Sequence, residues 1–145
     1  MKNNESCIKI CNQLLRGELS AIETYNQAID KFKDSPTEIE VLEQILVDHE
    51  DSAELLRDHL VEMGAVPDTD SGAWGAFAKA VEGTATLLGE SAALMALKEG
   101  EEHGIREYED ALADADVMEE AKETIREELL PRLVSHIPLL EALRV

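Results

Sequence analysis

Two glutamates and two histidines occupy positions where the sequence pattern calls for apolar side chains. Glu18 and Glu101 each lie in a stretch in which hydrophobic residues recur every three or four positions, and His49 and His136 lie in two further stretches of that kind. This periodicity is typical of the buried face of a helix. Carboxylates buried on such a face are costly unless other groups satisfy them. These four residues are therefore the first candidates for chemistry in this chain.

Four long periodic segments carry the four residues, one residue each. The sequence predicts helices over about 4–33, 36–63, 91–113 and 117–144. The crossover at 64–90 is interrupted by glycine and proline and should contain a short helix. Two short turns and one long crossover predict an all-α four-helix bundle of two antiparallel hairpins, in a single domain over 1–145. The crossover also lets the second and third helices run parallel.

Local signals place the helix ends. The second helix is expected to start with a capping box at Ser35–Glu38, with Pro36 in its first turn, and to stop at Gly64. Asp116 with Glu119 predicts a second capping box, before the fourth helix. Proline removes a backbone donor, so two prolines should kink the fourth helix: Pro131 and Pro138.

Composition excludes several classes of partner. The 145-residue chain has 32 acidic and 13 basic residues, a net charge of −19, and would repel nucleic acids and anionic membranes. It has no apolar run long enough to span a bilayer and no signal-peptide pattern. Cys7 and Cys11 are poorly spaced for a disulfide, so we expect reduced thiols that pack as small apolar residues. These features predict a cytoplasmic protein, with an acidity that suits solubility, attraction for cations or a salty cytoplasm.

The two halves of the chain resemble each other at matched spacing, which suggests duplication of a helical hairpin. The first and third segments share five residues: Gly17, Glu18, Ile22, Tyr25 and Ala28 match Gly100, Glu101, Ile105, Tyr108 and Ala111. The second and fourth also share five: Val47, His49, Glu54, Leu56 and Arg57 match Val134, His136, Glu141, Leu143 and Arg144. The tyrosines follow the glutamates by two helical turns and so share their face.

The chain resembles the rubrerythrin branch of the ferritin-like superfamily in one pattern: on the first and third helices, Gly-Glu is followed by six residues and then tyrosine. Nearly the whole chain is similar to a bacterial family of uncharacterised ferritin-like bundles, a domain of unknown function. Four segments carry this similarity: Leu15–Glu18, Met63–Pro67, Lys98–Leu112 and His136–Arg144.

The resemblance implies roles for the four polar residues. Glu18 and Glu101 correspond to the terminal carboxylate ligands of a dimetal site, and His49 and His136 correspond to its histidines. Such sites carry a bridging glutamate three residues before each histidine. Those two positions here are leucines: Leu46 and Leu133.

The loss of both bridging residues leaves three states of the site open. In a metal-free core, each glutamate would bond a histidine or tyrosine, with Lys98, one turn before Glu101, as internal counter-ion. Alternatively, two glutamates and two histidines could bind one Fe, Zn or Mn ion. An active di-iron centre would need a substitute carboxylate, and Glu50 is the nearest in sequence.

Two functions follow from these states. The first is a non-enzymatic bundle with a degenerate metal site, which acts through its surface or as a homo-oligomer. The second is a metal-binding oxidoreductase or an iron-handling protein. A rubrerythrin-type peroxidase is disfavoured because the chain lacks the Cys-x-x-Cys pairs of a rubredoxin domain. Of the remaining candidates, His59 and His103 should be solvated and Trp74 should anchor the crossover.

Overall fold

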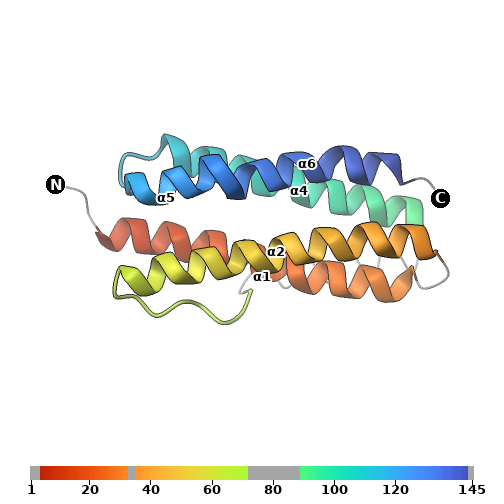
Figure 1. Cartoon of the computed structure of the whole chain (residues 1–145), viewed down its shortest axis with the longest axis horizontal. Helices are drawn as coiled ribbons and strands as arrows, with labels where there is room; N and C mark the ends of the chain where they lie inside the picture. Colours follow the sequence, from red (N-terminus) through yellow and green to blue (C-terminus); the bar gives the residue numbers. More distant parts are fainter. Residues whose placement is uncertain (1–3, 33–34, 72–88, 144–145) are drawn as a thin grey trace.

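The computed structural model describes residues 4–32, 35–71 and 89–143, and these ranges contain helices and no strands. The helices α1 (Asn4–Lys31) and α2 (Pro36–Glu62) form an antiparallel hairpin. Figure 1 shows this hairpin beside a second one, which confirms the predicted all-α bundle.

The second hairpin pairs α4 (Glu90–Ala113) with a helical run made of three parts. These parts are α5 (Glu119–Thr124), a π-helical turn η2 (Ile125–Leu129) and α6 (Leu130–Ala142). The four bounds predicted from periodicity are therefore close to those of the structure. The predicted short helix of the crossover and Trp74 lie outside the described residues.

Each long helix packs against two neighbours. Besides its hairpin partner, α1 contacts α4, and α2 contacts α6. Figure 1 shows that α2 and α4 run in the same direction, as the long crossover predicts. No described helix combines the length and the apolar character needed to cross a membrane.

Both ends of α2 lie where the sequence places them, but the capping box at its start is not formed. Pro36 occupies the first turn, whereas the Ser35 side chain makes no bond to its own helix. The Ser35 hydroxyl instead donates to Glu90 Oε2 of α4 at 3.4 Å, so it joins the two hairpins. At the other end Gly64 has φ = +78°, and the N–H of Ala65 donates to the carbonyl of Leu60. Glycine adopts this left-handed conformation at no steric cost.

The second predicted capping box, Asp116 with Glu119, is wrong. The residue before α5 is Met118, and no side chain caps that helix. The Asp114 carboxylate accepts a hydrogen bond from the N–H of Asp116 at 2.8 Å, two residues earlier than predicted. This short-range bond stabilises the turn rather than the helix start.

The two prolines of the fourth segment behave differently from each other. The π-turn η2 ends two residues before Pro131, and the N–H of Leu130 donates to the carbonyl of Ile125, five residues back. A wider turn accommodates the missing proline donor and its ring without ending the helix. By contrast, α6 continues through Pro138 to Ala142.

The core consists of two apolar clusters separated by a polar layer. The first cluster includes Cys7, Cys11, Leu56, Leu60, Ile125, Leu129 and Leu133, and the second includes Phe32, Leu42, Ile45, Leu94, Leu97 and Leu140. Every long helix contributes to both clusters, with its buried glutamate or histidine between them. Cys7 and Cys11 form no disulfide and are fully buried, as expected of small apolar residues. Burial and the neighbouring Cys7 raise the pKa of Cys11 to about 12.

Candidate functional site

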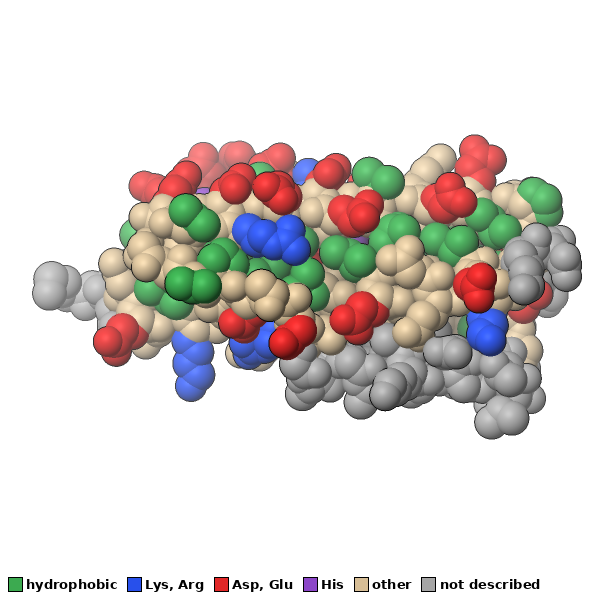
Figure 2. Space-filling model, turned by 90° about the horizontal axis from the view of Figure 1, so that it is seen from below, with side chains coloured by type: hydrophobic (Ala, Val, Ile, Leu, Met, Phe, Trp, Pro, Cys, Tyr) green, Lys and Arg blue, Asp and Glu red, His purple; other side chains and the backbone are tan. Residues whose placement is uncertain are grey.

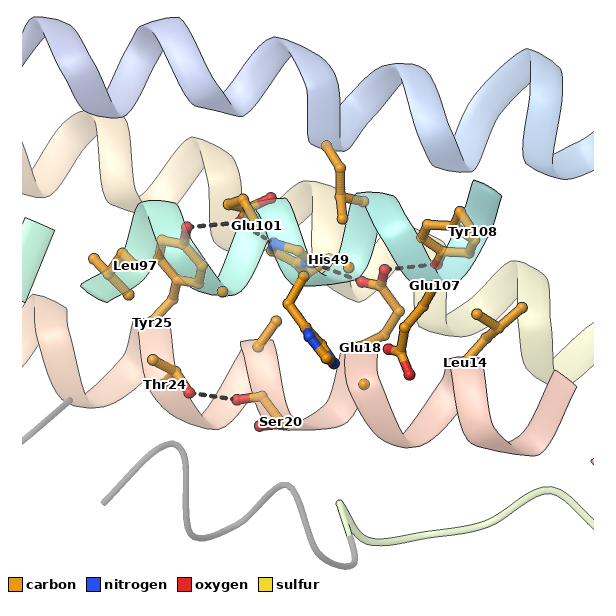
Figure 3. Close-up of a pocket in the computed structure, with 16 residues that line it drawn as sticks. Leu14, Glu18, Ser20, Thr24, Tyr25, His49, Leu97, Glu101, Glu107 and Tyr108 are labelled. Carbon is orange, nitrogen blue, oxygen red and sulfur yellow. Dashed lines mark hydrogen bonds and ion pairs between the residues drawn. The ribbon is translucent and has the colours of Figure 1, made fainter. Parts of the chain in front are cut away.

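The polar layer brings together the four residues that the sequence singles out. Glu18 on α1, His49 on α2, Glu101 on α4 and His136 on α6 are all at most 3% exposed. Each lies on the apolar face of its helix, so the packing of the bundle directs all four toward its axis. Figure 3 shows Glu18, His49 and Glu101 meeting between α1, α2 and α4.

Hydrogen bonds within the layer follow the internal repeat. His49 Nδ1 lies 2.6 Å from Glu18 Oε2, and His136 Nδ1 lies 2.8 Å from Glu101 Oε1. Each histidine therefore uses the same nitrogen on the glutamate of its own half. This equivalence supports the duplication inferred from the sequence.

The two tyrosines cross between the halves. Tyr108 donates to Glu18 Oε1 at 2.7 Å, and Tyr25 donates to Glu101 Oε2 at 2.6 Å. Each carboxylate thus accepts from the tyrosine of the other hairpin. Burial and the adjacent Glu101 carboxylate raise the pKa of Tyr25 well above its usual value. Burial and the adjacent Glu18 carboxylate do the same for the pKa of Tyr108, so both phenols stay protonated and act as donors.

The Nε2 atoms of the two histidines have non-equivalent partners, unlike their Nδ1 atoms. His49 Nε2 lies 2.8 Å from Glu101 Oε2, so the His49 ring bridges both buried glutamates. His136 Nε2 lies instead 2.7 Å from Asp48 Oδ2. The Asp48 side chain is 40% exposed and that of His136 only 1%, so Asp48 links the buried layer to solvent. Asp48 was not predicted as part of the site.

Charge within the layer favours a protonated His49. Burial alone would lower the pKa of His49, but the charges and hydrogen bonds of Glu101 and Glu18 outweigh it and hold that pKa well above its usual value. For Glu101, burial opposes ionisation, yet charge and hydrogen bonds from His49 and His136 lower its pKa to about 2. The layer therefore holds ionised Glu101 against an imidazolium.

Lys98 is not the internal counter-ion that the sequence suggests. Its Nζ lies 2.8 Å from Glu141 Oε2 on the surface, and one third of the side chain is exposed. Side chains on a helix lean toward its N-terminus, so Lys98 points away from Glu101, which follows it. His49 supplies the positive charge that was assigned to Lys98.

Three other candidates differ in their surroundings. Glu50 is exposed, because it follows His49 directly and so points away from the buried face. His59 is not simply solvated, since its Nε2 lies 2.8 Å from Thr124 Oγ1 in a half-buried contact. His103 is also half-buried and lines a hollow between α1 and α4.

One ion fits this layer better than two. One ring nitrogen of His49, one of His136 and one oxygen of Glu101 lie within 4.8 Å of one another. Glu18 approaches the other ring nitrogen of His49, outside that group. The two positions at which the resemblance would place bridging carboxylates hold leucines, of which Leu133 is buried in the apolar core. The donor set therefore suits one cation and lacks the ligands that join a pair.

The fold and this layer define a class of protein: an all-α bundle with a buried glutamate–histidine centre. The chain belongs to the family described as "Domain of unknown function (DUF2383)", whose model matches residues 6–114. That range includes Glu18, His49 and Glu101, and His136 lies beyond it. No curated protein and no solved structure gave a significant match.

Proposed function

We propose that this chain is a ferritin-like bundle that binds one divalent transition-metal ion through His49, Glu101 and His136. Its two antiparallel hairpins, the parallel α2 and α4, and the repeated glutamate and histidine positions support a ferritin-like origin. In this proposal the centre is a degenerate dimetal site that retains one ion and has no oxidase activity.

The observation that carries the proposal is the setting of the two histidines. Each directs one nitrogen at Glu101 and has a carboxylate on its other nitrogen, Glu18 for His49 and Asp48 for His136. Metal-binding histidines nearly always donate their second N–H to a carboxylate, carbonyl or water, which fixes the ring and raises its basicity. Here both rings have such a partner.

The donor set limits which ion can bind. Two imidazoles and a carboxylate suit iron, zinc or manganese, and a bound ion would supply Lewis acidity or, for iron and manganese, redox chemistry. The protein's own contribution is to orient the ligands. Glu18 fixes the ring of His49, and Tyr108 in turn fixes Glu18.

Binding can be tested on untagged protein by elemental analysis, followed by titration of chelator-treated protein with Zn²⁺ or Co²⁺. We expect one ion per chain and a melting temperature that rises with metal concentration. At a hundredfold excess over Kd, binding to the native state alone adds about 2.7 kcal/mol of stability.

Matched variants assign the ligands. Glu101→Gln should abolish binding, whereas His59→Gln, which alters a histidine outside the layer, should leave it intact. Binding of two ions per chain, or equal binding by Glu101→Gln and wild type, would contradict the proposal.

A second candidate, a metal-free bundle that acts through its surface, is favoured by a different observation. Among the described residues, no buried side-chain nitrogen or oxygen lacks a hydrogen-bond partner. Protonated His49 already neutralises much of the buried negative charge. If this candidate is right, chelator and added metal will both leave the melting temperature unchanged.

A further inference from the structure

A small cavity lies against the buried layer, between α1 and α4. It has a volume of about 50 Å³, and Glu18, His49 and Glu101 form part of its wall. Such a volume holds a few water molecules. Three glycines contribute to its lining, Gly17, Gly100 and Gly104. The layer can therefore be approached from the α1–α4 side of the bundle.

A wider hollow on the same two helices adjoins this cavity. Its volume is about 310 Å³, and it shares Leu14, His103 and Glu107 with the inner cavity. Two further carboxylates, Asp110 and Asp114, also line this hollow. No described residue that lines either space is lysine or arginine. The outer hollow carries three carboxylates, and a hollow lined by carboxylates attracts cations.

Glu107 lies where the two spaces meet. It points from α4 toward α1, next to Glu18 (Figure 3). The amide of Gln13 donates to Glu107 Oε2 at 3.2 Å and so holds the carboxylate in this position. A Cβ on Gly17 would lie 3.4 Å from Glu107 Oε1, so the carboxylate lies close to the backbone of α1 at this point.

We propose that the passage between α1 and α4 is the route by which divalent cations reach the buried centre, and that Glu107 is a transit residue that draws them inward. This inference rests on the proposed metal-binding function and adds an entry path to it. The route runs from Asp110 and Asp114 past Glu107 to Glu18. Glu107 contacts the ion during entry and is not a ligand of the final site.

A transit residue and a ligand have different kinetic effects. Removing the charge of a transit residue slows association, whereas removing a ligand speeds dissociation. Glu107→Gln suits this test because its amide oxygen can still accept the hydrogen bond from Gln13. Glu109→Gln is the matched control, since it changes the net charge equally, from an exposed position on the same helix.

The experiment measures association and dissociation of Co²⁺ with chelator-treated full-length protein by stopped-flow absorption. At low salt, Glu107→Gln should slow association by about threefold to tenfold relative to both wild type and Glu109→Gln. Glu107→Lys should slow it further, and the difference should shrink in high salt. The dissociation rate should not rise in any of these variants.

The contrary outcomes separate the two proposals. Equal association rates for Glu107→Gln and Glu109→Gln, with Co²⁺ still bound, would overturn the entry route alone. Faster dissociation from Glu107→Gln would make Glu107 a ligand and would also overturn it. If wild-type protein binds no Co²⁺ at equilibrium, the metal site and its entry route both fail.

Discussion

At the scale of single residues, His49 is the group on which the polar layer depends. It bridges Glu18 and Glu101, and its protonation places a positive charge between two buried carboxylates. The sequence pattern could place His49 in the core because apolar residues flank it at helical spacing. It could not show that one ring reaches both glutamates, since that depends on the distance between α2 and its neighbours.

Replacing His49 should therefore be far more damaging than replacing Lys98. In chelator-treated protein, His49→Leu leaves two buried carboxylates without their cation, and breaking a buried pair from one side costs about 3–5 kcal/mol. Lys98→Met removes a surface ion pair with Glu141 and should leave stability nearly unchanged. Urea unfolding of both variants measures the difference. A larger loss in Lys98→Met would show that Lys98 stabilises the layer after all.

Glu101 should make stability depend on pH in acid. Its pKa is about 2 in the folded protein, against an ordinary value of 4.5. Between these values the unfolded chain binds a proton that the folded chain does not, so stability is fully present above pH 4.5 and is lost as pH falls toward 2. The contribution is on the order of 3 kcal/mol.

The test of this pH dependence is urea unfolding of chelator-treated protein at a series of acid pH values. Glu101→Gln should flatten the dependence, while Glu109→Gln, at an exposed site on the same helix, should not. The same slope in wild type and Glu101→Gln would assign the acid sensitivity to other carboxylates.

Asp48 and Glu107 show why part of the site could not be predicted. Both are half-buried, and each belongs to an acidic chain in which most carboxylates are on the surface. The internal repeat does not mark Asp48 as a site residue, because the matching position in the second half is Ser135. Their proximity to His136 and to Glu18 comes from packing between helices, which no local pattern encodes.

At the scale of the helices, glycine at position 104 sets how closely α4 approaches α6. A Cβ there would lie 2.6 Å from Leu133 Cδ2, and Leu133 is only 3% exposed. Leu133 packs in the first apolar cluster and also lines the inner cavity, so it can move aside only in part and at the cost of its core contacts. The glycine is thus required by packing between helices rather than by its own backbone conformation.

Alanine substitutions should separate this packing from helix propensity. Gly104→Ala should destabilise the protein by about 1–3 kcal/mol through overpacking. Gly17→Ala should instead be neutral or stabilising by up to about 1 kcal/mol, since its Cβ would make only an ordinary contact. Thermal unfolding compares the two.

A double variant identifies the cause. The cost of Gly104→Ala should shrink in a Leu133→Ala background, which removes the clashing methyl group. An equal cost in both backgrounds would mean that Leu133 is not the obstacle.

Helix positions were predictable, whereas details of helix ends and turns were not. Alternating steps of three and four residues fix α1, α2 and α4 to within a few residues, because burial of one face requires that spacing. The hydroxyl of Ser35 could accept from a backbone N–H of its own helix or donate to a carboxylate, and it donates to Glu90 of the other hairpin without forming the local cap. The π-turn before Pro131 is likewise one of several ways to accommodate a proline.

At the scale of the whole molecule, the acidic surface opposes the compact state. Acidic side chains lie along the full length of the face in Figure 2, with few basic ones between them. With a net charge of −19, folding brings many like charges close together. Composition alone indicates this effect, because it depends on total charge and hardly on fold.

Salt should therefore stabilise the protein. Raising NaCl to about 1 M shortens the screening length to about 3 Å, so the melting temperature should rise. Replacing four exposed glutamates by glutamine should reduce this rise: Glu109, Glu120, Glu123 and Glu127. A melting temperature independent of NaCl would show that repulsion at the surface is too weak to matter.

The position of the polar layer between two apolar clusters also restricts how the helices can align. Aliphatic helices can slide past one another by a turn with little loss of contact area, because leucine fits against leucine in either alignment. Here such a slip would set Glu18 or Glu101 against aliphatic side chains and separate it from its histidine and tyrosine. The loss of those bonds would far exceed the cost of a shifted apolar contact. We infer that the layer fixes the register of the four helices, and that it selects this one longitudinal alignment whether or not a metal is bound.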